Sequence, residues 1–211
     1  MTTPILHHYD TSPFSEKVRL MFGLKGLAWS SVVIPVIMPK PDYTPLTGGY
    51  RRTPSLQIGA DVYCDSQVIL AELEHRFPDP TAVRGGLDWA INLWADRLFF
   101  QTTVPVIFGE LGDNVPADFI KDREALSGRP FDTAAMKAAE PAPAPDHDAA
   151  NPQQLTPGQT VAVMADDYGR DPIRGTLVAA ARDRTVIARE DPAVGKVHVH
   201  FPKTGYLVFP G

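Results

Sequence analysis

The pattern of apolar and polar positions predicts a strand, a helix and a second strand over the first 36 residues. Residues 5–6 open an extended run, and Asp10–Pro13 interrupts it. Apolar side chains then recur at helical spacing over residues 14–25, and Gly26 is a typical helix stop. The β-branched run at residues 29–36 predicts the second strand. Because a helix joins the two strands, we expect them to be parallel neighbours.

A hairpin and another helix follow. Residues 38–53 carry three prolines and Gly48-Gly49, which indicate a loop with room for at most one helical turn. Two short strands are predicted at residues 54–58 and 62–64, around the turn Gly59-Ala60-Asp61. Asp65 or Ser66 then caps an amphipathic helix that ends before Pro78.

The middle of the chain changes character. Residues 87–108 predict a long helix that Pro105 ends or kinks, and residues 116–136 predict a second helix with an interruption at 128–130. We therefore expect a short α-helical segment at residues 85–139. Five prolines among small and polar residues make residues 140–156 a predicted Pro/Ala-rich linker, partly extended and poorly ordered.

The last part of the chain reads as all-β. Five short strands are predicted at residues 160–164, 175–179, 185–189, 196–201 and 206–209, with turn signals between them. This spacing favours a small SH3-like or OB-like barrel over residues 157–211, to which no function is assigned. His198 and His200 alternate onto one strand face. Without a nearby Cys or carboxylate in the pattern, we expect an exposed strand face and no metal site.

Composition excludes several classes of function. The 211 residues are 44% hydrophobic and 21% charged, as in ordinary globular proteins. The start of the chain does not resemble a signal peptide, and no apolar run is long enough to span a bilayer, so we expect no membrane partner. The net charge is −5, the acidic excess lies wholly in residues 86–154, and no part is basic enough to suggest nucleic acid. The single cysteine, Cys64, excludes an internal disulfide and suits a cytoplasmic location.

The turn before the first helix is the strongest candidate for chemistry. A hydroxyl at Thr11 or Ser12 lies beside unpaired backbone N–H groups and the positive end of the helix dipole, a place that stabilises an anion. The alternative is that the side chain only caps the helix. Residues alone leave both open.

Three local matches, in order along residues 5–80, resemble the thioredoxin-like N-terminal domain of the glutathione transferases. Ser12-Pro13-Phe14-Ser15 resembles the Cys-Pro-Phe/Tyr-Cys turn of glutaredoxins and omega-type transferases, with serine at both cysteine positions. Residues 52–56 resemble the Gly-Lys-Val-Pro-Val-Leu segment, whose proline is cis in the family. Asp65-Ser66 resembles the Glu/Asp-Ser pair that opens the last helix of that domain. The resemblance implies a thioredoxin-like α/β domain over residues 1–84.

The resemblance also implies a glutathione site with a job for each residue. Glutathione would lie as an added strand beside Thr53, with its γ-glutamyl ammonium near Asp65 and its γ-glutamyl carboxylate at the helix opened by Ser66. Arg52 would approach the glycyl carboxylate; the alternative, equally favoured, is a solvated charge on a loop. For Asp65-Ser66 the alternative is that they only cap the helix. Ser12 would stabilise the thiolate as the catalytic residue. The implied glutathione-binding set is Ser12, Phe14, Arg52, Thr53, Pro54, Asp65 and Ser66.

Serine at position 12 changes the expected chemistry. Thiol–disulfide exchange needs a thiolate there, so a redox role ranks below attack of glutathione, as co-substrate, on a small electrophile. Cys64, on a predicted central strand, is expected to be a buried small hydrophobe, and His7 and His8 to be structural. The rival hypothesis is a non-catalytic glutathione- or protein-binding module, because the helical segment is about half the family's usual length.

The same short segment predicts a homodimer. Residues 87–108 carry Trp89, Trp94, Phe99 and Phe100, and few further helices follow to cover them within one chain. Burial of this aromatic stripe against a second copy is the expected resolution.

Overall fold

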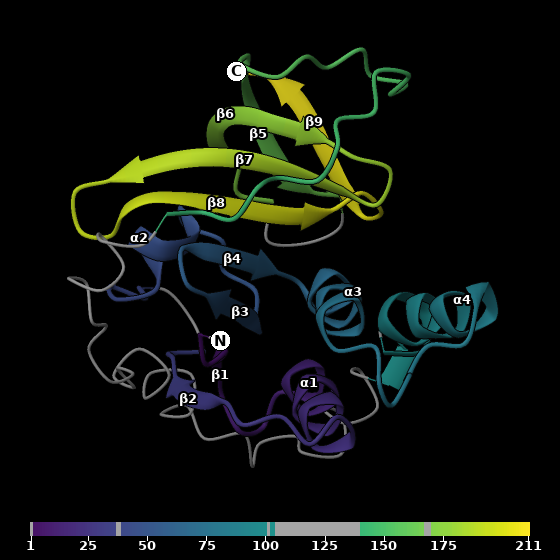
Figure 1. The fold of residues 1–211 in the computed structure, drawn as a ribbon. Coiled ribbons are helices and arrows are strands. Elements are labelled where there is room, and N and C mark those ends of the chain that lie inside the picture. Colours follow the sequence, from purple (N-terminus) through teal and green to yellow (C-terminus); the bar gives the residue numbers. More distant parts are fainter. Residues whose placement is uncertain (1, 37–38, 101, 104–139, 167–169) are drawn as a thin grey trace.

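The computed structural model describes residues 2–36, 39–100, 102–103, 140–166 and 170–211. One nine-stranded mixed sheet runs through the molecule in the order β2-β1-β3-β4-β8-β7-β6-β5-β9 (Figure 1). Its first half holds β1 (Ile5–His8), α1 (Pro13–Leu24), β2 (Ser30–Val33), α2 (Thr44–Thr47), β3 (Ser55–Ile58), β4 (Asp61–Cys64) and α3 (Ser66–Arg76). Then come α4 (Gly86–Trp94), the π-helical turn η1 (Ala95–Phe99), β5 (Thr160–Ala165), β6 (Ile173–Ala180), β7 (Arg184–Asp191), β8 (Gly195–Pro202) and β9 (Tyr206–Pro210).

The first half has the predicted thioredoxin-like arrangement. β1 pairs parallel to β2 and antiparallel to β3, and β3 and β4 form the hairpin. α1 and α3 cover one face of these strands. Their apolar side chains form a first core with the strands, composed of Leu6, Val18, Met21, Phe22, Leu56, Tyr63, Val68, Ile69, Leu70 and Leu73.

The five predicted C-terminal strands are all present, but a separate small barrel is not confirmed. β8 pairs parallel with β4, with Asp61 opposite His198 and Tyr63 opposite His200, so the later strands extend the first sheet. β4 would otherwise be an edge strand with a row of unpaired N–H and C=O groups, although all four of its residues are buried. Pairing with β8 satisfies those groups. The sequence pattern does not predict this pairing of β4 with β8.

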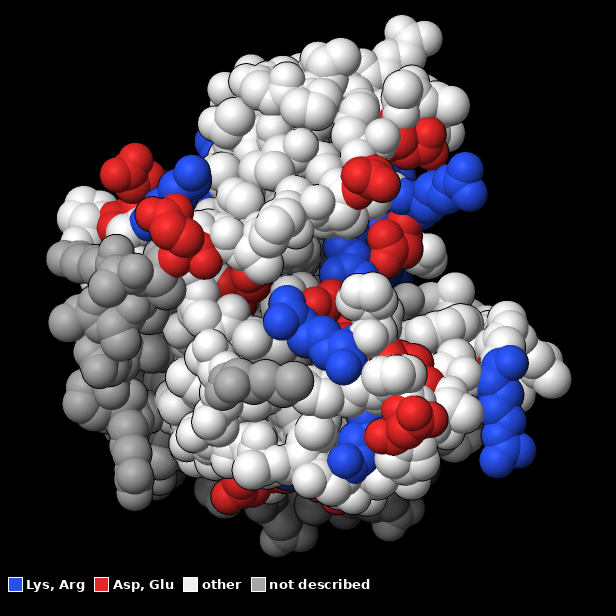
Figure 2. All heavy atoms as spheres, viewed as in Figure 1, with Lys and Arg blue, Asp and Glu red and all other residues white. Residues whose placement is uncertain are grey.

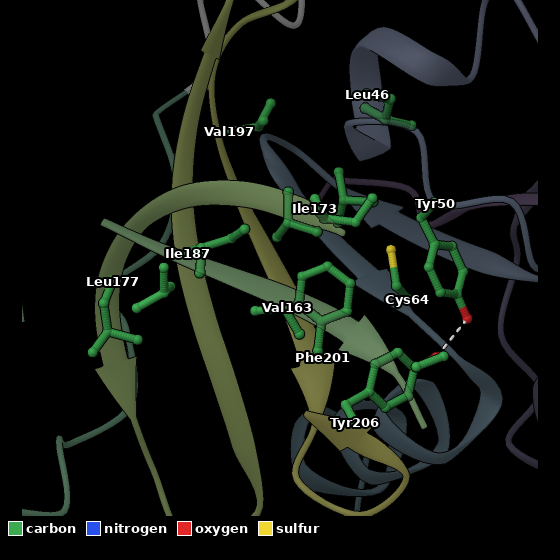
Figure 3. Close-up of a cluster of buried hydrophobic side chains, with 14 of the residues drawn as sticks. Leu46, Tyr50, Cys64, Val163, Ile173, Leu177, Ile187, Val197, Phe201 and Tyr206 are labelled. Atoms are coloured by element: carbon green, nitrogen blue, oxygen red, sulfur yellow. Dashed lines mark hydrogen bonds between the residues drawn. The ribbon is translucent and has the colours of Figure 1, made fainter. Parts of the chain in front are cut away.

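The two halves also share a second core on the other face of the sheet. Leu46, Tyr50 and Cys64 from the first half pack directly against side chains of β5–β9, as Figure 3 shows. The first half contributes six buried residues to this core: Ile34, Tyr43, Leu46, Tyr50, Val62 and Cys64. The C-terminal strands thus cover the face that α2, only four residues long, leaves open.

A buried ionic cluster joins α3 to the C-terminal strands on the opposite face of the sheet. Glu72 accepts hydrogen bonds from Tyr63 Oη (3.1 Å), Arg76 Nε (2.6 Å) and Arg184 Nη1 (2.8 Å). Charged side chains of both signs gather across the middle of the face in Figure 2, below the strands β5–β9. We name Tyr63, Glu72, Arg76 and Arg184 the seam cluster.

The expectation of an exposed histidine face on residues 196–201 is wrong for His200. Its ring stacks on Tyr63, with 4.6 Å between centroids, and its Nε2 lies 3.3 Å from Asp61 Oδ1. His200 is therefore buried, because the parallel β4–β8 pairing places Tyr63 beside it. Among the residues that the structure describes, no cluster of three or more His, Cys, Asp or Glu side chains is arranged to hold a metal.

The middle of the chain is described in part. The predicted long helix begins as α4 and continues through η1, and the predicted helix at residues 116–136 lies outside the described residues. Residues 140–149 contact both β4 and β6. The Ala142 N–H donates to Asp61 Oδ2 (2.8 Å), and the Asp148 N–H donates to Ala180 O (3.0 Å). Within the described ranges, no helix has the length and apolar character needed to span a membrane.

Candidate ligand-binding site

Three separate segments of the first half meet at one small surface hollow. It is lined by Phe14 from α1, by Tyr50, Arg52 and Thr53 from the loop before β3, and by Asp65 and Ser66 at the start of α3. The hollow has a volume of about 30 Å³, which leaves room for only one or a few water molecules. A ligand larger than water would therefore lie across the hollow rather than inside it.

The N-terminus of α3 gives one side of the hollow a fixed polarity. Ser66 begins this 11-residue helix, and Asp65 caps it by accepting a hydrogen bond at Oδ1 from the Gln67 N–H (3.0 Å). Asp65 has a φ of 85°, unusual for a residue with a side chain. Such backbone conformations cluster at ligand-binding sites. The helix terminus offers free N–H groups to an anion while the Asp65 carboxylate offers acceptors to a cation.

The loop that carries Thr53 is held from behind by two buried side chains. Lys40 Nζ donates to Arg51 O (2.6 Å) and Thr53 Oγ1 (3.3 Å), and Tyr43 Oη donates to Arg52 O (3.0 Å). Burial, with a smaller effect of the Arg51 charge, lowers the pKa of Lys40 to about 8. The Thr53–Pro54 peptide bond is cis, as the resemblance implies.

Ser12 is an N-cap. Its Oγ accepts a hydrogen bond from the Ser15 N–H (3.1 Å), and Pro13 occupies the first helical position after it. Ser12 is only 1% exposed and does not line the hollow. Ser15, at the position of the family's second cysteine, is buried, and its Oγ has no hydrogen-bond partner within the described part of the chain. The capping reading of Ser12 is therefore confirmed, while a role toward a ligand stays a prediction.

The helix after the first half approaches the hollow from one side. Phe14 packs edge-on against Phe100, with 4.6 Å between ring centroids. Lys17, one turn further along α1, forms a 2.6 Å ion pair with Asp96 and donates to Asn92 Oδ1 (2.9 Å). α4 and η1 are thereby tied to α1 beside the hollow.

Three other candidate residues of the sequence lie in the core. Burial raises the pKa of the Cys64 thiol to about 12, so Cys64 is a buried small hydrophobe, as predicted, rather than a nucleophile. His7 Nε2 lies 3.0 Å from Gln57 Oε1, and burial lowers the His7 pKa to about 4. His8 Nε2 lies 2.7 Å from Ser31 Oγ. Both histidines are bound within the sheet, away from the hollow.

Sequence reasoning missed Tyr50 and Tyr206 as members of this neighbourhood. Tyr50 lines the hollow, and Tyr206 Oη donates to Asp65 Oδ2 (3.2 Å). Tyr50 follows Gly48-Gly49 in a stretch predicted only as loop, and Tyr206 comes from the last strand. A signal for Tyr50 was its place two residues before Arg52; no local pattern connects Tyr206 with residue 65.

Comparison with known proteins finds relatives of the whole chain and of its first half. A family model described as "Glutathione S-transferase, N-terminal domain" matches residues 6–81. A solved structure of a GST-like protein from Pseudomonas syringae is 34% identical, with 98% of this chain and 99% of that chain covered and a TM-score of 0.78. A glutathione S-transferase from Rhodospirillum rubrum F11 is 22% identical over 47% of each chain, with a TM-score of 0.43. No curated protein matches the chain.

Proposed function

Because the chain belongs to the glutathione S-transferase family, we propose that the hollow binds glutathione and that the protein uses its thiolate to attack a small electrophile. One observation carries the proposal. Five of the six residues that line the hollow are ones matched to the family's glutathione-binding positions: Phe14, Arg52, Thr53, Asp65 and Ser66. These residues come from three segments that are separated along the chain, so their meeting at one surface is a property of the fold.

The charges of glutathione fit the two sides of the hollow. In the proposed pose, its γ-glutamyl carboxylate lies at the α3 N-terminus by Ser66, where helix N–H groups stabilise an anion. Its ammonium contacts the Asp65 carboxylate, and the cysteinyl backbone pairs with the main chain of Thr53 as an added strand. Arg52 is the cation nearest to Thr53 in sequence and meets the glycyl carboxylate.

The proposed chemistry takes place at the N-terminus of α1. The glutathione thiol gives up its proton to water, and the thiolate sulfur donates an electron pair to an electrophilic carbon. A C–S bond forms, the bond between that carbon and the leaving group breaks, and the leaving group departs with the electron pair of the broken bond. The Ser12 oxygen already accepts the Ser15 N–H, so its hydroxyl hydrogen is the part that would donate to the thiolate.

A second function, non-catalytic binding of glutathione or of a protein, is favoured by one observation. Ser12 is 1% exposed, so a bound thiolate has little access to its hydroxyl. The two functions differ in one measurable quantity, the conjugation rate.

Calorimetry with glutathione, followed by a conjugation assay on the same sample, tests both. We expect binding heat below millimolar glutathione and turnover of an activated aryl halide. Binding without turnover would favour the binding module. No heat at millimolar glutathione would contradict the whole proposal.

Replacing Ser12 by alanine is expected to slow conjugation about a hundredfold, the usual cost of removing one positioned donor. Loss of the helix cap costs about 1 kcal/mol of stability in addition. Ser15→Ala is the matched control, because it removes a buried hydroxyl of the same helix that caps nothing. Steady-state rates of both variants and of Ser12→Thr, which keeps the hydroxyl, measure the effect. Equal rates in Ser12→Ala and Ser15→Ala would leave Ser12 as a cap alone.

We also propose that the protein is a cytoplasmic homodimer that pairs through α4 and η1. Five large apolar side chains of this segment are exposed by half or more: Leu87, Ile91, Trp94, Leu98 and Phe99. Trp89, in contrast, packs partly against the α1–α3 core. Burying the exposed side chains against a second copy is worth roughly 1.5–3 kcal/mol each.

Light scattering at micromolar concentration tests the dimer. We expect twice the mass of one chain for the wild type, and a monomer for the double variant Trp94→Glu with Leu98→Glu. Phe209→Glu is the control, because Phe209 is a similarly exposed aromatic on β9, away from α4. A monomeric wild type would contradict the proposal.

A further inference from the structure

The last strand of the chain contacts the proposed glutathione site. Tyr206, the first residue of β9, is 8% exposed, and its Oη donates to Asp65 Oδ2 (3.2 Å). Tyr206 Oη also lies 3.0 Å from Tyr50 Oη (Figure 3). The Arg52 guanidinium carbon lies 5.8 Å from the centroid of the Tyr206 ring. Three of the six residues that line the hollow therefore touch one side chain from the C-terminal strands.

The hydrogen bonds in this group have one consistent direction. The Tyr206 hydroxyl donates its one hydrogen to Asp65, so its oxygen accepts the hydrogen bond from Tyr50. Burial raises the pKa of both phenols well above 10, which keeps both hydroxyls protonated and able to donate. The hydrogen bonds thus run from Tyr50 to Tyr206 and from Tyr206 to the Asp65 carboxylate, which accepts the last of them.

This arrangement fixes the Asp65 carboxylate at both oxygens. Oδ1 accepts the Gln67 N–H at the helix start, and Oδ2 accepts Tyr206. A carboxylate held at two points cannot rotate freely, and each oxygen keeps a further lone pair for a ligand. Without Tyr206, the bond to the Gln67 N–H would be the one remaining hydrogen bond to this carboxylate from the residues that the structure describes.

The turn that leads into Tyr206 is itself anchored to neighbouring segments. The Asp166 N–H donates to Gly205 O (3.0 Å), and Arg97 Nη1 pairs with Asp166 Oδ1 (2.7 Å). Gly205 has a φ of 85°, and a Cβ built there would overlap the Arg97 guanidinium. The positive φ favours glycine at this position, and the contacts of Arg97 connect η1 with the turn before Tyr206.

We propose that Tyr206 is a positioning residue of the glutathione site, which holds the Asp65 carboxylate against the ammonium of a γ-glutamyl ligand. The inference rests on the proposed function and adds to it. The C-terminal strands become a necessary part of the site, and the site gains selectivity for ligands that carry a free α-ammonium group on a γ-linked glutamyl unit.

Two ligands and three variants test this role by calorimetry. The ligands are glutathione and its desamino analogue, in which a glutaryl group replaces the γ-glutamyl group. Tyr206→Phe keeps the ring and removes the hydrogen bond. We expect Tyr206→Phe to bind glutathione about tenfold more weakly than the wild type, the loss typical of one hydrogen bond to a charged group. Its affinity for the desamino analogue should stay within about twofold.

The matched control is Tyr63→Phe. Tyr63 is also buried, and its hydroxyl contacts Glu72 and Arg76, away from the hollow. We expect this variant to lose stability without loss of affinity for either ligand. Tyr50→Phe is the second site variant and replaces Tyr206→Phe if that variant does not fold. It should lower the affinity for glutathione by about two- to fivefold and leave the affinity for the desamino analogue unchanged.

The outcomes separate the two claims. If the wild type binds glutathione and the folded site variant binds it with the same affinity, the role of Tyr206 is overturned and the proposed function still stands. Equal weakening of both ligands would also overturn it, because a general disturbance of the fold does not select for the ammonium. No binding by the wild type would overturn the proposed function and the role of Tyr206 with it.

Discussion

A chain that ends at residue 84 is expected not to fold cooperatively, although these residues include every element of the thioredoxin-like half. Six of their buried side chains belong to the core shared with β5–β9. Exposure of a large apolar side chain forfeits roughly 1.5–3 kcal/mol. Six such losses are as large as the whole net stability of a typical domain, about 5–15 kcal/mol. The open edge of β4 would in addition favour aggregation.

Circular dichroism and thermal melting of the shortened chain measure this effect. We expect a broad transition and binding of a hydrophobic dye, in contrast to a sharp transition for the full chain. Co-expression with a second chain of residues 140–211 is the control, and it should restore the sharp transition by re-forming the β4–β8 pairing. A cooperative melt of residues 1–84 alone would show that the shared core is dispensable.

Replacement of Glu72 by glutamine is expected to cost about 3–5 kcal/mol, because it leaves Arg184 and Arg76 near a neutral partner in a buried place. Glu72 and Arg184 side chains are 8% and 10% exposed. Burial alone raises the pKa of Glu72, but hydrogen bonds from Arg184 and Arg76 outweigh burial, so its pKa lies below the usual 4.5. A depressed carboxyl pKa stabilises the folded state above pH 4.5, and this contribution is lost as the pH falls through the lower, folded-state pKa.

Urea unfolding of Glu72→Gln at neutral and acid pH checks both expectations. The variant should be less stable at neutral pH and should lose less stability than the wild type on acidification below pH 4.5. Asp171→Asn is the control, because it breaks an exposed ion pair between Asp171 and Arg51. Their side chains are 49% and 48% exposed, and such a pair contributes at most about 1 kcal/mol. Similar small losses in both variants would mean that the seam cluster does not hold the halves together.

The parts of the site that the sequence predicts are those marked by local chemistry. Pro13 with Ser12 marks a helix start, Thr53-Pro54 opens a strand, and Asp65-Ser66 opens a helix, and each of these signals lies within a few residues. The fold then brings Phe14, Thr53 and Asp65 together, because Phe14 follows β1, Thr53 precedes β3 and Asp65 follows β4. These strand termini lie at the same end of the first sheet. Family resemblance supplied the ligand, which no residue pattern names.

The parts that the sequence did not predict depend on contacts between distant segments. The pairing of Asp61 with His198, and the bond from Tyr206 to Asp65, join positions more than a hundred residues apart. Strand periodicity predicts which residues form a strand but not which strand is its neighbour, so the five predicted strands do not reveal that β8 pairs with β4. A hint was present in β4, whose short run of Asp-Val-Tyr-Cys carries little that suits a solvent-facing edge.

The parallel pairing of β4 with β8 has a consequence for the order in which the chain becomes native during synthesis. Residues 1–84 leave the ribosome first, yet the strand that completes their sheet is among the last to emerge. Until then the β4 edge and one apolar face await partners, so the early half persists as an incomplete intermediate of the kind that chaperones bind. Contacts between segments so far apart in the sequence also slow folding, since the intervening chain loses conformational entropy before the contacts form. We therefore expect the nascent chain to be prone to aggregation until β8 has emerged.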